Sequence, residues 1–231
     1  MMNLVFFETA VELIPLSIIS HPSVKRNAKR RGKKAQEVLL DRSLHHHAMN
    51  RLNVHEKRGR PDIIHMCLLL ALGSPLNKLN HLRTWINTQQ GYTISVNPET
   101  RIPRNYNQFT SLLEQLYKTG KVPPNEELTL LRLEKKELGE LIQDISPTET
   151  IALSSHGQKK SMNELARIMK NIDTPLVMIG AYPKGPMEET TSSLADHVYS
   201  VHDSVLEAWT VTSRLLYEYE NQIFRSIGVN S

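Results

Sequence analysis

The segment Arg58-Gly59-Arg60-Pro61-Asp62-Ile63-Ile64 opens a stretch that is apolar nearly all round, which predicts a buried helix. Pro61 suits the first helical position, where its missing N–H group would have no partner in any case. Asp62 adds a negative charge where it favours the helix dipole. Arg58 and Arg60 instead place positive charge at the positive end of that helix. Because free N–H groups and guanidinium groups together bind phosphate, the segment predicts a bound anion.

A second arginine cluster, Arg101-Ile102-Pro103-Arg104, also lies just before a predicted helix. Asn105 or Asn107 is a suitable N-cap for that helix, which would run to Tyr117 and stop at Gly120. Its apolar residues recur at the i, i+3, i+4, i+7 spacing of one helical face: Phe109, Leu112, Leu113 and Leu116. Two clusters in the same position relative to a helix predict an extended phosphate-binding surface.

Basic residues also gather between Lys25 and Lys34, where the run KRNAKRRGKK holds seven in ten positions. The net charge of the chain is only +4, so the excess is local. The run has two interpretations: a solvated loop, or a nucleic-acid contact in which Lys and Arg displace counterions from a phosphate backbone. The two arginine clusters favour the second, which predicts binding that weakens as salt rises.

The composition, 39% hydrophobic and 23% charged over 231 residues, is that of a globular protein with a sizeable core, and we expect one domain spanning 1–231. The single cysteine, Cys67, excludes an intramolecular disulfide and a cysteine-rich zinc site, and it favours a reducing, cytoplasmic setting. No apolar run reaches the length of a membrane span. Glu8 and Glu12 near the N-terminus argue against a signal peptide. We therefore expect no membrane partner.

Three consecutive histidines, His45 to His47, follow a segment of helical character over Ala35–Leu44. Three successive side chains on a helix point in three directions, so they cannot share one metal ion. We therefore expect a histidine cluster at the surface or at an interface, and no metal site.

Predicted strands alternate with predicted helices along the chain. The strands are Leu4–Phe7, Tyr92–Val96, Leu128–Leu133, Thr150–Ser154, Leu176–Ile179 and His197–Val201, and the further helices are Ile63–Leu72 with Gly73 at its end, Glu137–Ile142, Ser161–Lys170 and Glu207–Phe224. Pro15–Ser20 is either another strand or an irregular connection, and Leu82–Trp85 is assigned to a short connection. This alternation predicts an α/β fold with a mostly parallel sheet and helices packed on it.

Three segments leave the ends of predicted strands: Ser154–Gly157, Gly180–Pro186 and Val201–Leu206. Ligands bind preferentially at the carboxyl ends of parallel strands, so these segments can line one pocket. Gly180–Pro186 matches neither the Walker pattern nor G-x-G-x-x-G. On its own it indicates no more than a strand-to-helix turn.

Four groups of residues along the chain carry a resemblance to a known family. They are Arg58-Gly59-Arg60-Pro61-Asp62-Ile63, Ser74-Pro75-Leu76-Asn77-Lys78, Val96-Asn97-Pro98 with Arg101-Ile102-Pro103-Arg104, and Ile179-Gly180-Ala181 with Gly185. In order and spacing the chain resembles the Nep1 (Emg1) ribosome-biogenesis methyltransferases from Leu4 to its last helix, and its compact length resembles archaeal members. The resemblance implies a SPOUT-type α/β domain with helices on both faces of the sheet, a C-terminal trefoil knot within about residues 148–231, and a homodimer.

The same resemblance implies S-adenosylmethionine as the cofactor and N1 of a pseudouridine in small-subunit (16S-type) ribosomal RNA as the methyl acceptor, with a role in small-subunit ribosome biogenesis. The implied cofactor contacts are Gly180, Gly185, Val201, His202, Asp203, Ser204, Val205 and Leu206. The implied RNA-binding residues are Arg60, Arg101 and Arg104, with Asp62 holding Arg60 and with Gln108 where eukaryotic relatives have an arginine.

The sequence identifies no catalytic residue. An aspartate between two arginines is stabilised in its charged form and makes a poor base, so Asp62 is given a structural role. An alternative function is an RNA-binding ribosome assembly factor whose methyl transfer is secondary. A structural dimer with no RNA role is disfavoured by the two arginine clusters.

Overall fold

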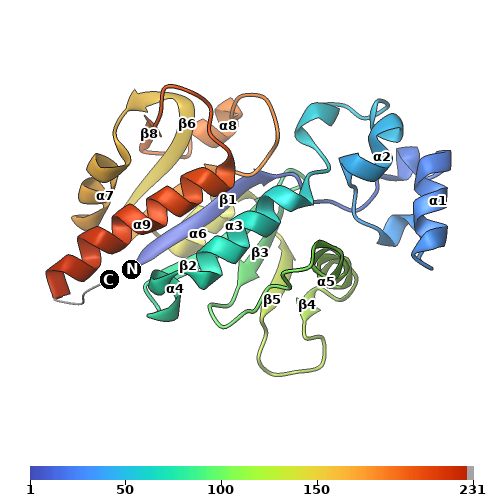
Figure 1. The fold of residues 1–231 in the computed structure, drawn as a ribbon, viewed down its shortest axis with the longest axis horizontal. Coiled ribbons are helices and arrows are strands. Elements are labelled where there is room, and N and C mark those ends of the chain that lie inside the picture. Colours follow the sequence, from blue (N-terminus) through green and yellow to red (C-terminus); the bar gives the residue numbers. More distant parts are fainter. Residues whose placement is uncertain (228–231) are drawn as a thin grey trace.

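The computed structural model describes residues 1–227, with side chains for residues 1–224, and centres on one eight-stranded sheet (Figure 1). The strand order is β4-β5-β3-β2-β1-β7-β6-β8. The strands are β1 (Met2–Thr9), β2 (Leu82–Thr88), β3 (Tyr92–Val96), β4 (Lys121–Val122), β5 (Leu131–Lys135), β6 (Glu149–Lys159), β7 (Pro175–Gly180) and β8 (His197–Ser200). The pairs β1–β2, β1–β7, β6–β7 and β6–β8 are parallel, which confirms the predicted mostly parallel sheet. The edge formed by β3, β5 and β4 is antiparallel.

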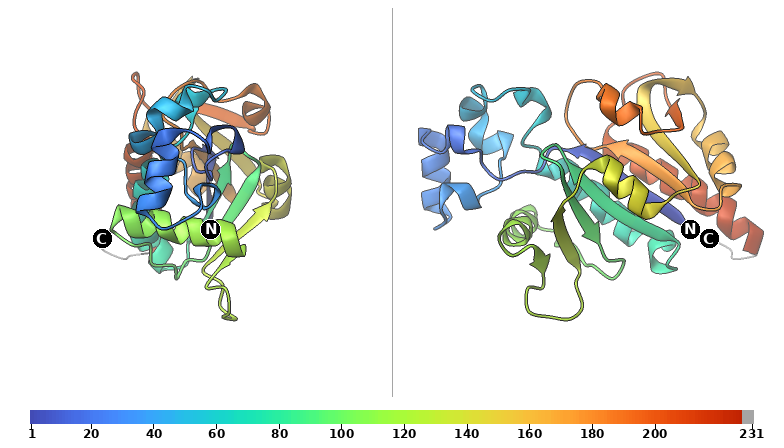
Figure 2. Two further views of the ribbon diagram at one scale, coloured as in Figure 1. Left: turned by 90° about the vertical axis from the view of Figure 1, so that its right-hand side faces the viewer. Right: turned by 180° about the vertical axis from the view of Figure 1, so that it is seen from behind.

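Helices cover both faces of the sheet, as predicted (Figures 1 and 2). Helices α3 (Pro61–Gly73), α7 (Met162–Lys170) and α9 (Ala208–Ile227) pack on the face that receives Leu4 and Phe6. Helix α6 (Leu138–Ile145) packs on the opposite face, against Val5 and Phe7. These four residues of β1 are fully buried because successive side chains of a strand point to opposite faces, and both faces are covered here.

Helices α3 and α5 (Tyr106–Thr119) begin and end where the sequence predicted. Pro61 is the first residue of α3, and Gly73 is its last. The Asn105 side chain caps α5 by accepting a hydrogen bond from the backbone N–H of Gln108 at 3.2 Å. Gly120 ends α5 in the left-handed region, with φ of 73°. The remaining short helices are α4 (Pro75–Lys78) and α8 (Glu189–Ser192).

The residues between β1 and α3 form a small lobe beside the sheet (Figure 1). The lobe contains α1 (Pro22–Arg30), α2 (Arg42–Met49) and the 3-10 turns η1 (Leu16–Ile18), η2 (Ala35–Glu37) and η3 (His55–Lys57). It has an apolar cluster of its own, which includes Ile14, Ile18, Val24, Leu40 and Met49. The buried carboxylate of Glu114 joins the lobe to α5. It accepts hydrogen bonds from Arg31, from Lys33 Nζ at 2.6 Å and from the backbone N–H of Leu39 at 3.0 Å.

Predictions for this lobe were wrong in several places. The basic run Lys25–Lys34 is not a loop, because through Arg30 it belongs to α1. The predicted helix Ala35–Leu44 is instead a 3-10 turn followed by an extended segment, in which Leu39 forms a bridge with Leu13. The helix begins only after Asp41, whose side chain caps α2. For Pro15–Ser20, in contrast, the second of the two predicted alternatives is confirmed: it is an irregular connection that contains η1.

Of the three histidines expected in a cluster at the surface or at an interface, His46 and His47 are exposed with their ring centroids 5.5 Å apart, whereas His45 is fully buried. Nδ1 of His45 accepts a hydrogen bond from the backbone N–H of Asp41 at 3.0 Å. Its Nε2 lies 2.9 Å from the side-chain amide of Asn27. Burial lowers the pKa of this ring below 6.5. His45 is therefore a polar link between α1 and α2.

Two predictions for the sheet were also wrong. Leu82–Trp85 is not a connection but the first part of β2, which lies between β1 and β3. The segment Ser154–Gly157 does not leave the end of a strand but lies inside β6, which extends to Lys159. The pairing of β6 with β8 shifts between Leu153 and Gln158, so the residues in between bulge out of the ladder. No helix within residues 1–227 is long and apolar enough to cross a membrane.

Candidate active site and nucleic-acid interface

A cavity of about 610 Å³ lies at the carboxyl ends of β7 and β8, beside the bulge within β6. Its walls come mainly from residues within 154–156, 180–187 and 200–208. These are the three segments that the sequence analysis placed around one pocket, so that geometric prediction is confirmed. They meet because β7 and β8 end at the same edge of the sheet, and β6, which lies between them, bulges out of the ladder there.

Close backbone approaches shape this cavity. A Cβ atom on Gly157 would lie 2.6 Å from the backbone of Tyr199, so only glycine lets β6 return to β8 after its bulge. Gly185 has φ of 96°, a conformation that side-chain-bearing residues rarely adopt. The glycines therefore allow the loops to follow paths that expose main-chain groups to the cavity.

Most of the implied cofactor contacts line the cavity: Gly180, Gly185, Val201, His202, Ser204, Val205 and Leu206. Asp203 does not. Its carboxylate accepts a hydrogen bond from the Lys159 ammonium on the exposed surface, and that bond lowers the pKa of Asp203. Next to it, Nδ1 of His202 accepts a hydrogen bond from the backbone N–H of Ser204 at 3.0 Å, which fixes the turn. The side chains of Lys159 and Asp203 are 79% and 78% exposed, so the ion pair lies on the surface outside the cavity.

Several lining residues were not named as site residues from the sequence. Ile63 comes from the first turn of α3, and Tyr182 and Lys184 come from the loop after β7. His156 lines the cavity from the bulge of β6. Membership of the three loops was the only local signal for Tyr182, Lys184 and His156. Ile63 had none, because its place depends on how α3 packs against the end of the sheet.

The opening segment of the sequence lies beside this cavity, and its two arginines have different partners. Arg60 donates from Nε and one terminal nitrogen to the two Asp62 oxygens, at 2.8 and 2.7 Å. This hydrogen bonding raises the pKa of Arg60. About a third of the Arg60 side chain remains exposed. The fork of Arg60 is thus oriented by Asp62 and remains accessible, which agrees with the role that the resemblance implied for Asp62.

At Arg58 the prediction of a bound external anion was wrong. Its guanidinium binds both oxygens of Glu12, at 2.6 and 2.5 Å, and hydrogen bonding to that carboxylate raises the pKa of Arg58. The positive charge of Arg58 is therefore neutralised inside the protein by Glu12, which lies in the segment just after β1, and it needs no external anion.

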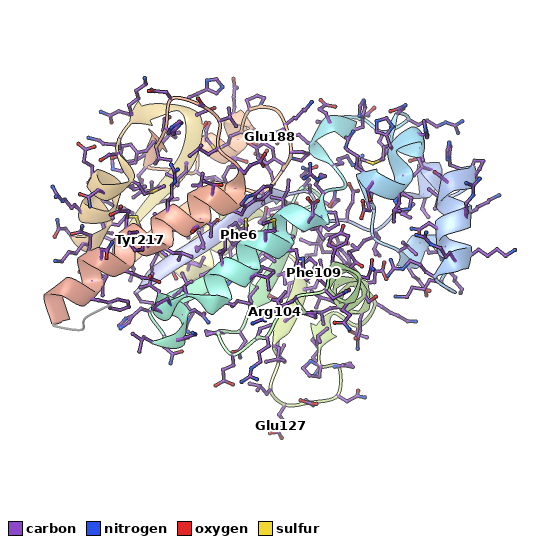
Figure 3. The ribbon with its side chains drawn as sticks, in the orientation of Figure 1. Phe6, Arg104, Phe109, Glu127, Glu188 and Tyr217 are labelled. Carbon is purple, nitrogen blue, oxygen red and sulfur yellow. The ribbon has the colours of Figure 1, made fainter. Side chains whose placement is uncertain are left out.

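The second arginine cluster is placed by aromatic and histidine contacts. Nε2 of His65, on α3, lies 2.7 Å from the carbonyl oxygen of Pro103, and its ring stacks on Phe109 at 4.3 Å between centroids. Arg101 and Arg104 flank Pro103 and are exposed, and their side chains make no hydrogen bond or ion pair within the part of the chain that the structure describes. Figure 3 labels Arg104 and Phe109, which lie near the start of α5.

Gln108 lies on the exposed side of the first turn of α5. It lines a shallow depression with Pro103, Asn107, Ser111, Leu112 and Gln115. The side chains here are mostly neutral amides and hydroxyls, so this face offers hydrogen bonds next to the charge of Arg104.

The cavity and the arginine surface meet at the N-terminus of α3. Ile63 lines the cavity, while Arg60, three positions earlier, lies within electrostatic range of Glu207, another lining residue. Within the described residues no cluster of His, Cys, Asp and Glu is suited to hold a metal ion. The arrangement combines a cavity for a small molecule with an adjoining cationic surface.

A family model for EMG1/NEP1 methyltransferases matches residues 4–220 of this chain. The chain belongs to the EMG1/NEP1 methyltransferase family. Curated EMG1/NEP1 relatives include the ribosomal RNA small subunit methyltransferase Nep1 of Thermococcus onnurineus, which is 41% identical over 96% of this chain and 100% of its own length. The corresponding protein of Staphylothermus marinus is 42% identical over 95% of each chain.

A solved EMG1/NEP1 structure also matches this fold. The crystal structure of Archaeoglobus fulgidus Nep1 bound to S-adenosylhomocysteine has a TM-score of 0.84 and 37% sequence identity, and it covers 95% of this chain and 97% of its own. The resemblance that the sequence motifs indicated, including its archaeal character, is therefore confirmed.

Proposed function

We propose that this protein uses S-adenosylmethionine to methylate N1 of a pseudouridine in small-subunit ribosomal RNA, as a step in small-subunit ribosome biogenesis. Membership of the EMG1/NEP1 methyltransferase family supports the methyl transfer and the RNA class. The observation that carries the proposal is the junction at α3, where Ile63 faces the cavity and the Arg60–Asp62 pair lies beside it. A ribosomal RNA substrate also favours the expected cytoplasmic location.

The cavity fits the proposed cofactor in size and in chemistry. A volume of about 610 Å³ lies within the range of small-molecule sites. Ile63, Leu153 and Ile179 give it apolar walls for a purine, and the loops that contain Gly180 and Gly185 bring main-chain groups to its surface. When bound, S-adenosylmethionine supplies a methyl group already activated by a sulfonium sulfur. The protein therefore has to hold that cofactor and admit one base.

The RNA-facing residues would hold the substrate by charge and by planar contacts. Arg60, Arg101 and Arg104 can each bind phosphate through a guanidinium fork or stack on a base. A base must leave its stack to reach a cavity of this kind, which favours a single-stranded loop as the target. Pseudouridine is a C-glycoside whose N1 carries a hydrogen and can accept a methyl group, whereas N1 of uridine is bonded to the sugar.

The contribution of the protein is chiefly alignment of the two reactants. Asp62 is engaged through both of its oxygens with Arg60, which favours its positioning role over that of a base. Correct alignment of reacting groups can lower a barrier by several kcal/mol without a further catalytic group. The proposal accordingly assigns no general base.

The proposal keeps two expectations from the family resemblance. One is a C-terminal trefoil knot within about residues 148–231, and it is supported by the convergence of the β6 bulge and the loops after β7 and β8 on one cavity. The other is a homodimer. Sedimentation equilibrium of the full chain tests it, with a dimer mass expected and a monomer mass contradicting it.

Calorimetry tests the cofactor part of the proposal directly. Titration of the full chain with S-adenosylhomocysteine is expected to show one site per chain and saturable heat. A Val211→Trp variant, which narrows the cavity from α9, is expected to bind more weakly, and an Arg167→Ala variant on the exposed side of α7 to bind as the wild type does. Absence of binding by the wild type at millimolar ligand would contradict the enzyme assignment.

A further inference from the structure

Glu8 is an unusual residue at the end of the central strand β1. Its side chain is buried, and its φ of 46° lies in the left-handed region that residues with a side chain adopt only at a cost. The pairing of β1 with β2 shifts register at this point, between Phe6 and Thr9. A buried carboxylate on strained backbone does not by itself stabilise a sheet, so its contacts indicate what it does.

The Glu8 carboxylate links two segments that are far apart in the sequence. Its Oε2 accepts a hydrogen bond from Lys57 Nζ at 2.7 Å, and each of these side chains is only 8% exposed. Its Oε1 accepts a hydrogen bond from the backbone N–H of Glu188 at 3.0 Å. Glu188 follows the cavity-lining residues of the loop after β7, and Figure 3 places it where that loop faces the N-terminal lobe. Glu8 therefore holds the far end of the cavity loop.

Lys57 contacts the same loop at its beginning and in its middle. Its ammonium lies 4.5 Å from the centroid of the Tyr182 ring, a cation–π contact beside its ion pair with Glu8. Its aliphatic chain lies under Gly185, where a Cβ atom would be 3.1 Å from Lys57 Cε. The Gln89 side chain donates to the carbonyl oxygens of both Glu8 and Lys57, at 3.0 and 2.8 Å. The Glu8–Lys57 ion pair is therefore held in place by hydrogen bonds to its two backbone carbonyl groups as well as by the attraction between its side chains.

Lys57 and Arg58 form two parallel ion pairs with different neighbours. Lys57 binds Glu8 beneath the cavity loop, whereas Arg58 donates its hydrogen bonds to Glu12 and to the carbonyl oxygen of Asn53, away from that loop. Lys57 and Arg58 lie three and two positions before Arg60. We propose that Lys57, held by Glu8, is a positioning residue that pre-organises the loop of residues 182–188 for the methyl donor and fixes it to the segment that grips RNA.

This inference rests on the proposed function, because it assigns the cavity to S-adenosylmethionine. Its physical basis is that a loop ordered before binding does not lose conformational entropy when the ligand binds. Removal of a single partner would leave a buried unpaired charge and destabilise the fold. The variant to test is therefore the neutral, shape-conserving double substitution Glu8→Gln with Lys57→Met.

The experiment measures the dissociation constants of S-adenosylhomocysteine and of a ribosomal RNA fragment for the full-length variants. In Glu8→Gln/Lys57→Met we expect the cofactor constant to rise by at least about fivefold and the RNA constant to change less than about twofold, because only the cofactor loop loses its support. Lys57→Arg keeps a cation against Glu8 and Tyr182, and we expect it to bind S-adenosylhomocysteine within about twofold of the wild type. A general loss of stability would not produce this separation.

The matched control is Glu12→Gln/Arg58→Met, which neutralises the neighbouring ion pair away from the loop, and its cofactor affinity is expected to match the wild type. Gln89→Ala is a second test variant, at a partly exposed site outside the cavity. It removes the hydrogen bonds to the Glu8 and Lys57 backbones, and we expect the dissociation constant of S-adenosylhomocysteine to rise about threefold. An unchanged cofactor constant in both the Glu8/Lys57 variant and Gln89→Ala, or an equal loss in the control, overturns the inference. Failure of the wild type to bind S-adenosylhomocysteine overturns the proposed function instead.

Discussion

Arg58 and Arg60 have the same charge and lie two positions apart, yet their surroundings assign them different tasks. Arg58 is neutralised by Glu12, a residue that no local pattern connects with it. Arg60 is held by Asp62 in its own helix turn and remains partly exposed. The sequence shows Asp62 beside Arg60, but it does not show that Glu12 pairs with Arg58. These two residues are 46 positions apart, so their pairing depends on the fold.

Asp62→Asn is expected to weaken RNA binding several-fold with little effect on stability. The Arg60–Asp62 pair is exposed enough that its loss should change the free energy of unfolding by less than about 1 kcal/mol. The guanidinium would lose its charged, two-point support and with it the orientation that binds phosphate. Fluorescence anisotropy with labelled RNA measures the affinity, and Glu134→Gln, which breaks the exposed pair with Arg132, is the control. Equal RNA affinity for Asp62→Asn and wild type would contradict the role given to Asp62.

His45 predicts an acid-sensitive lobe. Its pKa in the folded protein is lowered below 6.5, mainly by burial, so the unfolded chain binds a proton that the folded chain resists. Stability is therefore unaffected by His45 above about pH 6.5 and falls as the pH drops from there through the lower folded pKa. Denaturant unfolding at about pH 7.5 and pH 5 should show that His45→Gln loses less stability on acidification than wild type does. His46→Ala, at an exposed site, should behave as wild type; an identical acid loss in all three proteins would count against this assignment.

Helices and strands with strong local signals were predicted well. The apolar stretch and Pro61 marked α3, and the spacing of Phe109, Leu113 and Leu116 with Gly120 marked α5. Elements that depend on distant partners were missed. The sequence of β2, LRTWINT, lacks the regular apolar–polar alternation of a half-buried strand, and the segment forms a strand because β1 and β3 flank it. The basic run became helix α1 because Val24 and Ala28 give it a buried face in the lobe.

The short segment before α5 provides a test of the phosphate-binding surface. Arg101 and Arg104 are exposed and have no internal partner among the described residues, so replacing both by alanine should leave the fold intact. For single-stranded RNA each lost phosphate contact should reduce the dependence of log affinity on log salt by about 0.7. RNA titrations at several salt concentrations measure that slope, with Arg167→Ala as the control. A slope that does not change would mean that these arginines do not contact phosphate.

At the scale of the whole molecule, the proposed cofactor cavity and the proposed RNA-binding surface come from different parts of the chain and meet at the start of α3. The cavity is built from the bulge of β6 and from the loops after β7 and β8, while the arginine surface comes from the start of α3 and the segment before α5. The sequence indicated both parts through its motifs and through the convergence of strand ends. It did not indicate Ile63, Tyr182 or the Glu8–Lys57 pair as parts of the site, since their roles arise from packing between segments that are distant in the chain.

The measurement that tests this account most directly compares two RNA hairpins that differ only in one base. The protein is incubated with S-adenosylmethionine and a small-subunit ribosomal RNA hairpin that carries either pseudouridine or uridine at the same loop position. The mass of the RNA is then measured by mass spectrometry. We predict that the pseudouridine hairpin gains the mass of one methyl group and that the uridine hairpin gains none. Methylation of the uridine hairpin would contradict the substrate assignment, and a gain on neither, with RNA binding intact, would favour an assembly factor whose methyl transfer is secondary.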